Sequence, residues 1–291
     1  MNRKQKNKRP RSRAGAIWFR FKKNKLALVG VVIIFIMSVL AIFAGVIVDY
    51  QADVVEQNAA IRMQPASGDH ILGTDSYGRD IFGRIVYGAR TSLAVGLSVV
   101  GLALIMGGVV GSIAGYFGGT IDIIIMRFMD ILLAIPSLIL AMAVVSALGT
   151  DIKNLTLALA IAHTPQFARV VRAAVMPLRG QEYVESARAF GTKNFRIITR
   201  HILPNAFGPI IVQATMQIGT AILNISSLSF IGLGIQSPAP EWGSMLAEAR
   251  EYLRYEPTLV LAPGICIMLA VFSFNRIGDG LRDALDPRLK N

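Results

Sequence analysis

The stretch EYVESARAFGTKNFRIITRHILP, residues 182–204, is polar and partly basic and lies between long apolar runs. Its first apolar residues recur at three- and four-residue steps, which gives a helix one apolar face: Tyr183, Val184, Ala187 and Phe190. Gly191 suits the left-handed end of a helix, Thr192 is a candidate N-cap, and Pro204 suits the first turn of another helix. The segment predicts a helix–turn–helix between membrane spans; an ordinary solvated loop is the alternative.

The composition indicates a membrane protein. The 291 residues are 53% hydrophobic and 16% charged, against roughly 25% charged in soluble domains. The net charge of +12 would suggest nucleic acid in a soluble protein, but basic loops on one side of a membrane explain it better, so we expect no nucleic-acid partner. The single Cys266 lies in an apolar run, which leaves no disulfide to form.

Six uncharged stretches predict the membrane spans: Leu26–Val48, Thr91–Ile121, Ile131–Thr150, Asn154–Ala168, Asn205–Pro240 and Pro257–Asn275. A span needs about 20 apolar residues, so the fourth stretch must continue past Arg169 and Arg172, whose long side chains reach the interface. Pro136 and Pro165 are expected to kink their spans. We therefore expect an all-α membrane protein with about six transmembrane helices.

Lys and Arg residues set the expected orientation. Residues 1–25 carry many basic side chains, from Arg3 to Lys25, and no acidic one, which predicts a cytoplasmic N-terminus. Six crossings return the C-terminus to that side, with 170–204 inside and the acidic segments 49–90 and 241–256 outside. Residues 14–25 fit a short helix on the inner leaflet of the membrane; a disordered basic tail is the alternative.

The predicted outer segments contain a candidate docking or gating surface. In HILGTDSYGRD, residues 70–80, turn-forming residues surround Asp75, Arg79 and Asp80, which are expected to pair and stiffen the chain. His70 has no partners at metal-ligand spacing, so we expect no metal site. Further along, Glu241 and Trp242 predict an exposed aromatic ring beside a charge. Simple bracing of the fold is the alternative role of 70–80.

Two features of the predicted spans concern the packing of the helices and the translocation route. Small residues at every fourth position of the second span predict a close helix contact: Gly107, Gly111, Gly115 and Gly119. The fifth span carries a polar cluster that includes Asn224, Ser226 and Ser227. This cluster would line a translocation route or hydrogen-bond the helices together, and the sequence favours neither.

Absent motifs indicate that another protein supplies the energy. No GxxxxGK followed by Ser or Thr occurs, so no P-loop is available for a nucleotide. The spans carry no Asp, Glu, Lys or Arg at mid-span, whereas a gradient-driven transporter would require such a residue. His163 has no catalytic partner near it in sequence and is expected to be packed or interfacial. We expect no enzyme activity and no cofactor in this chain.

Several motifs resemble those of one transporter family. Glu185-Ser186-Ala187, Gly191 and Leu203-Pro204 resemble the "EAA" loop of ABC importer permeases, with Ser186 and His201 departing from the usual Ala and Ile. Residues 70–80, 227–246 and 274–289 resemble segments of the C-type permeases for oligopeptides, dipeptides and nickel. The matching motifs occur in the same order over residues 70–289.

The resemblance implies the ABC type I importer permease fold in a bacterial inner membrane. It implies a second permease as heterodimer partner, two ATPase subunits that bind ATP and Mg²⁺, an extracytoplasmic substrate-binding protein, and surrounding lipid. It also assigns the ATPase-coupling role to the 182–204 loop, with these residues: Glu185, Ser186, Ala187, Arg188, Phe190, Gly191, Leu203 and Pro204. Di- or oligopeptides are the expected cargo; glutathione, nickel chelates and opines are alternatives, and a gradient-driven secondary transporter is the alternative of a different class.

These expectations divide the chain into four parts. They are a basic cytoplasmic segment (1–25), the first span with its outer loop (26–90), a permease core (91–277) with the coupling loop at 179–204, and a cytoplasmic tail (278–291).

Overall fold

The computed structural model describes residues 13–285, so the basic residues Arg3 to Arg11 and the tail 286–291 lie outside the described part. The described residues form helices and no strand, apart from one isolated bridge between Thr74 and Asp80. The α-helices are α1 (Arg13–Phe21), α2 (Lys25–Ile42), α3 (Ala44–Ile47), α4 (Ile81–Phe117), α5 (Gly119–Ala134), α6 (Ser137–Leu148), α7 (Ile152–Val175), α8 (Glu182–Ala189), α9 (Asn194–Ile197), α10 (Leu203–Phe230), α11 (Trp242–Ala249) and α12 (Thr258–Leu285). Short η1 (Tyr50–Val55), η2 (Ala59–Ile61), η3 (Ile198–Ile202) and η4 (Arg250–Tyr252) complete the chain. The all-α prediction is confirmed.

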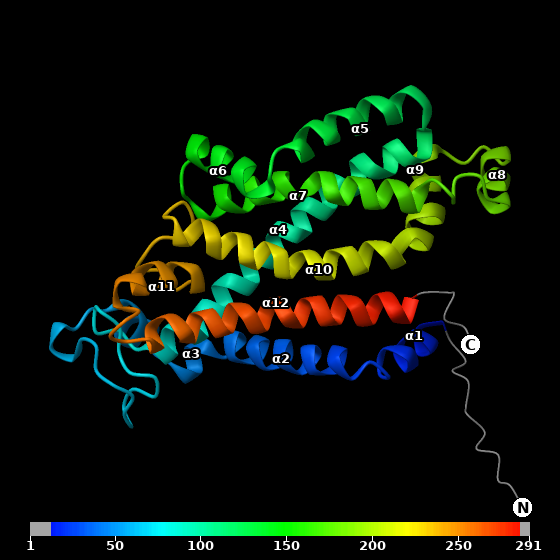
Figure 1. Cartoon of the computed structure of the whole chain (residues 1–291). Coiled ribbons are helices and arrows are strands. Elements are labelled where there is room, and N and C mark those ends of the chain that lie inside the picture. Colours follow the sequence, from blue (N-terminus) through cyan, green and yellow to red (C-terminus); the bar gives the residue numbers. More distant parts are fainter. Residues whose placement is uncertain (1–12, 286–291) are drawn as a thin grey trace, which may run out of the picture.

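The long helices form an elongated bundle with two distinct ends (Figure 1). One end, here the α8 end, carries α1, α8, α9 and the last turn of α12. The other, the α11 end, carries α3, α11 and the long segment between α3 and α4. The bundle therefore places the 182–204 loop at the same end as α1 and opposite the 70–80 segment, as the charge pattern predicts.

Four helices of the described chain are long and apolar enough to cross a membrane: α2, α4, the run Asn194–Phe230 that contains α10, and α12. The pair α5 and α6 would make a fifth span if the two count as one. α7 is the helix expected from Asn154–Ala168 and does continue past Arg169 and Arg172. Its 24 residues reach about 36 Å, but it is not among the helices that are apolar enough. In the described part of the chain, length and apolarity therefore identify four or five of the six predicted spans.

Several expected span boundaries are wrong. The stretch Ile131–Thr150 is not one helix, because α5 and α6 meet at an angle of 88°. Pro136 cannot continue α5, and the residue before it, Ile135, takes an extended backbone (φ −92°, ψ 125°). In contrast, Pro165 lies within α7, which runs through it without a break. The kink expected at Pro136 is in fact a sharp turn.

The first two spans also differ from their expected limits. α4 starts at Ile81, ten residues before Thr91, because the Asp80 carboxylate accepts a hydrogen bond from the Gly83 N–H at 2.6 Å and caps the helix. α4 ends at Phe117, because the next residue, Gly118, has a φ of +66° that breaks the helix. α2 stops at Ile42, short of the expected Val48, and the short α3 follows it.

The glycine pattern predicts the contact between α4 and α7. A side chain at Gly107 would meet Thr164 O at 2.7 Å, and one at Gly111 would meet the carbonyl of Ala168. Gly115 lies close to Val175 in the same way. The predicted close contact is confirmed for these three glycines, whereas Gly119 starts α5 and has open space around it.

Large apolar side chains cover the outer faces of α2 and α5. Phe35 is 66% exposed, and Ile124 and Phe128 are more than half exposed. Such surfaces are stable when lipid replaces water around them, since the hydrocarbon core is itself apolar. The arrangement fits a multi-pass membrane protein.

Candidate functional site

The first helix of the 182–204 loop, α8, ends just before Gly191, the residue that was predicted to end it. Gly191 has φ +74°, and its N–H donates to Arg188 O at 3.0 Å, while the Thr192 N–H donates to Ala187 O at 3.0 Å. These two bonds form a Schellman motif, which satisfies the free carbonyls at the end of α8. Thr192 was expected to cap the next helix, but its N–H belongs to this turn and Lys193 takes the N-cap position of α9.

One face of the loop is anchored in the protein's own core. Val184 of α8 is fully buried, and Ala187 is partly buried beside it. They pack in a cluster with residues from α4, α7, α9, η3 and α10: Tyr116, Val171, Val175, Ile197, Ile198, Ile202, Ala206 and Ile210. Ala187 and Phe190 were predicted to lie on one apolar face, but the structure separates them. Ala187 packs against this cluster, whereas Phe190 is exposed.

A polar contact fixes the same loop to the end of α4. Arg188 donates to the Tyr116 hydroxyl at 3.3 Å, and its guanidinium lies 5.5 Å from the centre of the Tyr116 ring. The Tyr116 hydroxyl in turn donates to the Asn194 side chain at 2.8 Å. One tyrosine at the end of α4 thus contacts both α8 and α9 and links the loop to α4.

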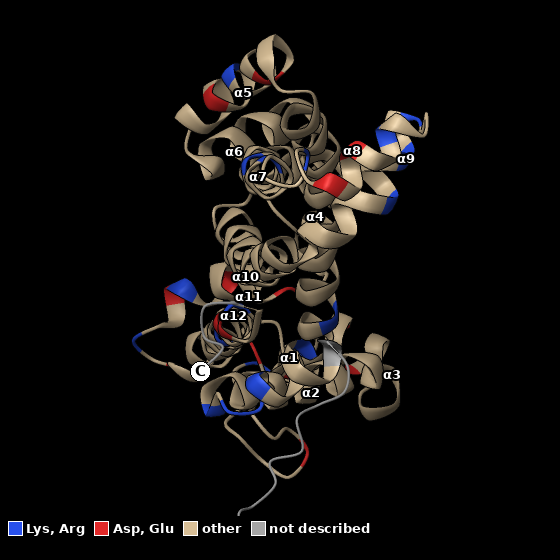
Figure 2. Cartoon of the chain, turned by 90° about the vertical axis from the view of Figure 1, so that its right-hand side faces the viewer, with Lys and Arg blue, Asp and Glu red and all other residues tan. Residues whose placement is uncertain are grey.

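The other face of the loop presents aromatic rings and charges to the outside. Phe190 is 89% exposed, Phe195 is 79% exposed, and Tyr183 is 40% exposed. Around them lie the exposed side chains of Glu182, Glu185, Ser186, Lys193, Arg196 and Arg200. Figure 2, which views the α8 end, shows Lys and Arg on this loop. Aromatic rings amid mixed charges are typical of a protein contact surface.

Sequence reasoning missed Phe195. It belongs to the one-turn helix α9, whose four residues are too few to show a periodicity. At the end of the loop, Leu203 packs partly against the buried cluster and Pro204 lines a cavity between α7, α10, α12 and α1. The residues predicted for this site are therefore close together, but only some of them face outward.

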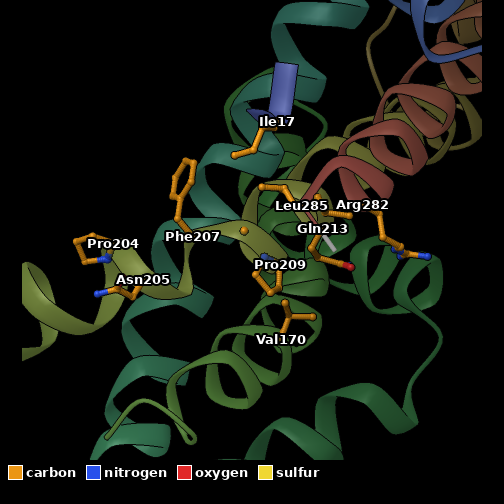
Figure 3. A pocket seen from close by; sticks show the side chains of 11 residues that line it. Ile17, Val170, Pro204, Asn205, Phe207, Pro209, Gln213, Arg282 and Leu285 are labelled. Carbon is orange, nitrogen blue, oxygen red and sulfur yellow. The ribbon is translucent and has the colours of Figure 1, made fainter. Parts of the chain in front are cut away.

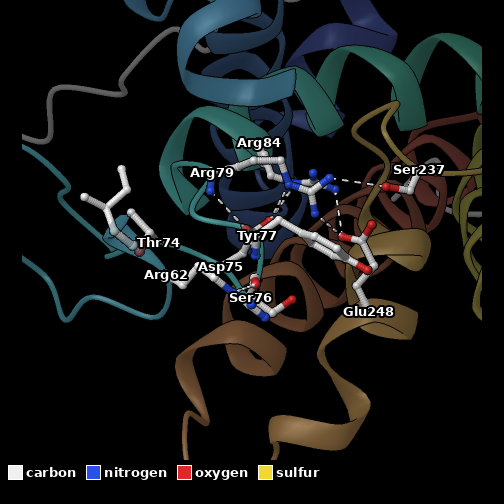
Figure 4. Close-up of polar contacts among 10 residues, drawn as sticks. Arg62, Thr74, Asp75, Ser76, Tyr77, Arg79, Arg84, Ser237 and Glu248 are labelled. Atoms are coloured by element: carbon white, nitrogen blue, oxygen red, sulfur yellow. Dashed lines mark hydrogen bonds and ion pairs between the residues drawn. The ribbon is translucent and has the colours of Figure 1, made fainter. Parts of the chain in front are cut away.

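A buried ion network lies at the α11 end (Figure 4). Arg79, which is fully buried, donates to Asp75 at 2.7 Å, to Glu248 at 2.7 Å and to Ser237 at 3.2 Å. Arg84 of α4, 1% exposed, donates to the same Glu248 at 3.0 Å. The predicted pairing of Arg79 with Asp75 is confirmed. The network ties the 70–80 segment, α4 and α11 together, and Glu248 was not found from the sequence.

Asp80 has a different partner from the one expected. Its carboxylate caps α4 and lies 2.9 Å from Nδ1 of His70. His70 therefore contacts a helix-capping carboxylate, and within residues 13–285 no group of three His, Cys, Asp or Glu side chains is placed to hold a metal.

Glu241 and Trp242 were expected to be exposed, and this is wrong because both are fully buried. The Glu241 carboxylate accepts hydrogen bonds from Ser92 of α4 at 3.2 Å, Ser226 of α10 at 3.1 Å and the N–H of Ser244 at 2.9 Å. Trp242 donates from its indole N–H to Ile85 O at 3.2 Å. α11 lies between α4, α10 and α12, so its first residues are enclosed by helices that are distant in sequence.

The polar cluster of the fifth span does not form a single site. Ser226 points to Glu241, Ser227 donates to Leu223 O of its own helix at 2.8 Å, and Asn224 lies 3.2 Å from Nε2 of His163. His163 of α7 is fully buried and faces α10, which agrees with the prediction that it is packed or interfacial.

Comparisons with known proteins agree with this arrangement. The family described as "Binding-protein-dependent transport system inner membrane component" matches residues 107–291. The family described as "N-terminal TM domain of oligopeptide transport permease C" matches residues 12–66.

Curated relatives match nearly the whole chain. The chain is 52% identical over 270 residues to the dipeptide transport system permease protein DppC of Alkalihalophilus pseudofirmus, covering 93% of this chain and 88% of that one. It is 43% identical over 280 residues to the di/tripeptide permease DppC of Pseudomonas aeruginosa, covering 94% and 92%. It is 44% identical over 273 residues to the glutathione permease GsiD of Escherichia coli, covering 94% and 90%.

Among solved structures, an inward-facing form of the MetNI methionine ABC transporter is similar in fold. The TM-score is 0.57 at 18% sequence identity, and the match covers 70% of this chain and 97% of that one. The shared helical arrangement is that of an ABC importer permease.

Proposed function

This chain belongs to the family of inner-membrane components of binding-protein-dependent transport systems, and from that premise we propose a specific place for it in a peptide importer. It is one of two different permease subunits, which together enclose the translocation path. Two ATPase subunits bind ATP and Mg²⁺ and attach to its α8 end. A substrate-binding protein delivers cargo to its α11 end.

The 182–204 loop is the contact with an ATPase subunit. The observation that carries this proposal is the exposure of Phe190 and Phe195 on a loop whose opposite face is buried. A groove on the partner would receive the two rings, with Glu185 and Ser186 at its edge. Because Val184 and Arg188 fix the loop to the core and to Tyr116, motion of the ATPase would be passed to α4, α7 and α10. Ala187 supports the loop from behind.

The sidedness follows from the same arrangement. The α8 end carries basic residues and faces the cytoplasm in the proposal, with both chain termini on that side. The α11 end faces outward, where the binding protein docks. Asp75, Arg79, Asp80, Glu241 and Trp242 act there as the buried frame of the outer surface.

Exposed side chains on that frame would make the docking contact. Ile71 is 61% exposed, Tyr77 is 41% exposed and Tyr255 is 79% exposed. Apolar and aromatic residues beside charged ones suit recognition of another protein. This replaces the expected contact through Glu241 and Trp242.

Di- and tripeptides are the proposed cargo. The support is the identity of 52% to a permease named for dipeptides and of 43% to one named for di- and tripeptides. Glutathione, which is itself a small peptide, stays an alternative because a glutathione permease is 44% identical.

Reconstitution of the complex tests the proposal. We expect liposomes that contain both permeases and both ATPases to take up a radiolabelled dipeptide only when ATP is inside with the ATPases and the binding protein is outside. The matched control omits this chain and should show no uptake. Uptake driven by an ion or proton gradient without ATP would contradict the proposal and support a secondary transporter.

A further inference from the structure

A line of polar side chains runs along one face of α10. Its members are spaced by four, three, four and three residues, which places them on the same side of a helix: Gln213, Gln217, Thr220, Asn224 and Ser227. From the first to the last, the line rises about 21 Å along the helix axis. It therefore covers about two thirds of a hydrocarbon core of about 30 Å. We call it the α10 polar line.

The α10 polar line lies between the side of α10 that contacts α7 and the side that contacts α12. Gln217 contacts His163 of α7. Gly219, on the other side, packs closely against Val271 of α12. Figure 1 shows α10 between α7 and α12.

Gln217 and Asn224 are held by α7 through a defined set of hydrogen bonds. The Gln217 amide donates its two hydrogens to Oε1 of Gln166 and to Nδ1 of His163, the latter at 3.3 Å. A neutral imidazole then carries its proton on Nε2. The Asn224 amide nitrogen lies 3.2 Å from Nε2. A neutral ring accepts at one nitrogen only, so one of the two amides presents its oxygen to the ring.

Two other members of the line are open, whereas the Ser227 hydroxyl donates to Leu223 O of its own helix. Thr220 is exposed and Gln213 is half-buried. Gln213 lines a cavity of about 730 Å³ together with Pro209, Val170 and Arg282 (Figure 3). In lipid, an exposed amide or hydroxyl loses its hydrogen bonds to water and costs free energy. The apolar outer face of α2 avoids that cost, so the α10 polar line is placed to face something polar.

We propose that the α10 polar line is the surface along which the peptide backbone of the cargo moves; this rests on the proposed importer function. Amides and hydroxyls offer both donors and acceptors, and a peptide group offers one of each, so the two are complementary. The line carries no charge and therefore does not select among charged side chains. It contacts the feature that all short peptides share.

This assignment changes the set of pathway residues. Ser226 is not part of the path, because its hydroxyl is held by Glu241 on another face of α10. Asn224 and Ser227 remain in it, and Gln213, Gln217 and Thr220 join them. His163 and Gln166 are positioning residues, since they fix the amide orientation of Gln217 and Asn224.

Uptake by substituted complexes tests the proposal. Thr220→Val and Thr215→Val are a matched pair on α10, because Thr215 lies off the line and bonds Ile211 O of its own helix at 2.8 Å. We expect Thr220→Val, alone or combined with Gln213→Leu, to take up a neutral dipeptide up to about tenfold more slowly at low concentration, as loss of one or two hydrogen bonds implies. Thr215→Val should match the unsubstituted protein.

A second variant tests the chemistry of recognition. Gln213→Glu should lower uptake of acidic dipeptides relative to basic ones, which a purely structural role would not do. Unchanged uptake and unchanged preference in these variants would overturn the assignment. Loss of co-purification with the second permease would also overturn it and make the line a subunit interface. Absence of ATP-dependent uptake by the unsubstituted complex would instead contradict the importer function itself.

Discussion

Replacing Arg79 by methionine should strongly destabilise the α11 end of the protein. Arg79 is fully buried and holds Asp75, Glu248 and Ser237 together, so its removal leaves Arg84 as the one arginine beside the two carboxylates. Removing one partner of a buried ion pair costs about 3–5 kcal/mol. Thermal unfolding of the purified complex in detergent, followed by loss of monodisperse protein, measures the effect.

The control for this variant is Arg169→Met. Arg169 pairs with Asp130 at 2.9 Å, but both side chains are about half exposed. Such a pair contributes roughly 0–1 kcal/mol, so the unfolding midpoint should move little. Equal shifts for the two variants would show that burial of the Arg79 network does not stabilise the fold.

Replacing Gly191 by valine should abolish ATP-driven uptake while leaving membrane insertion intact. At φ +74°, a β-branched residue is strained by more than the roughly 1 kcal/mol of an ordinary glycine substitution. No atom lies within 4 Å of the added Cβ, so the strain comes from the backbone alone. The turn would shift to relieve it and move Phe190 from its position. Uptake and co-purification of the ATPases measure the effect.

Gly180→Val is the matched control in the same loop. Gly180 also has open space around it, but it does not have a positive φ. It should keep uptake close to that of the unsubstituted protein, and Gly191→Asn should lie between the two valine variants, because asparagine tolerates the left-handed conformation better. Normal uptake in Gly191→Val would show that the shape of this turn does not matter for coupling.

Features that depend on neighbouring residues were predictable from the sequence. The left-handed Gly191 and the pairing of Asp75 with Arg79 each arise among residues close in sequence. The fresh helix start predicted at Pro204 is wrong, because the helical run Asn194–Phe230 continues through it. The close contact at Gly107, Gly111 and Gly115 was also visible, because small residues at a four-residue spacing have few other uses in a membrane helix.

Features that depend on distant partners were not predictable. Periodicity placed Val184 and Phe190 on one apolar face of a helix. The packing of α4, α7 and α10 decides that Val184 is buried and Phe190 is exposed. Glu241 looked exposed because a charge beside a loop usually is. Its burial depends on Ser92, which is 149 residues away.

The broken span at Pro136 shows a similar limit. The residues around Pro136 fit a kinked helix or a sharp turn equally well, because proline lacks a backbone N–H in either case. The 88° angle between α5 and α6 depends on how each packs against α7.

Site-directed crosslinking tests the central assignment most directly. A benzophenone probe is attached at Phe190→Cys or at Tyr255→Cys, with Cys266→Ser to remove the native thiol. Both positions are exposed aromatic residues, at opposite ends of the bundle. On illumination of the assembled complex in membranes, we predict a crosslink to an ATPase subunit from position 190 and none from position 255. An ATPase crosslink from position 255 alone, or from neither position, would contradict the account.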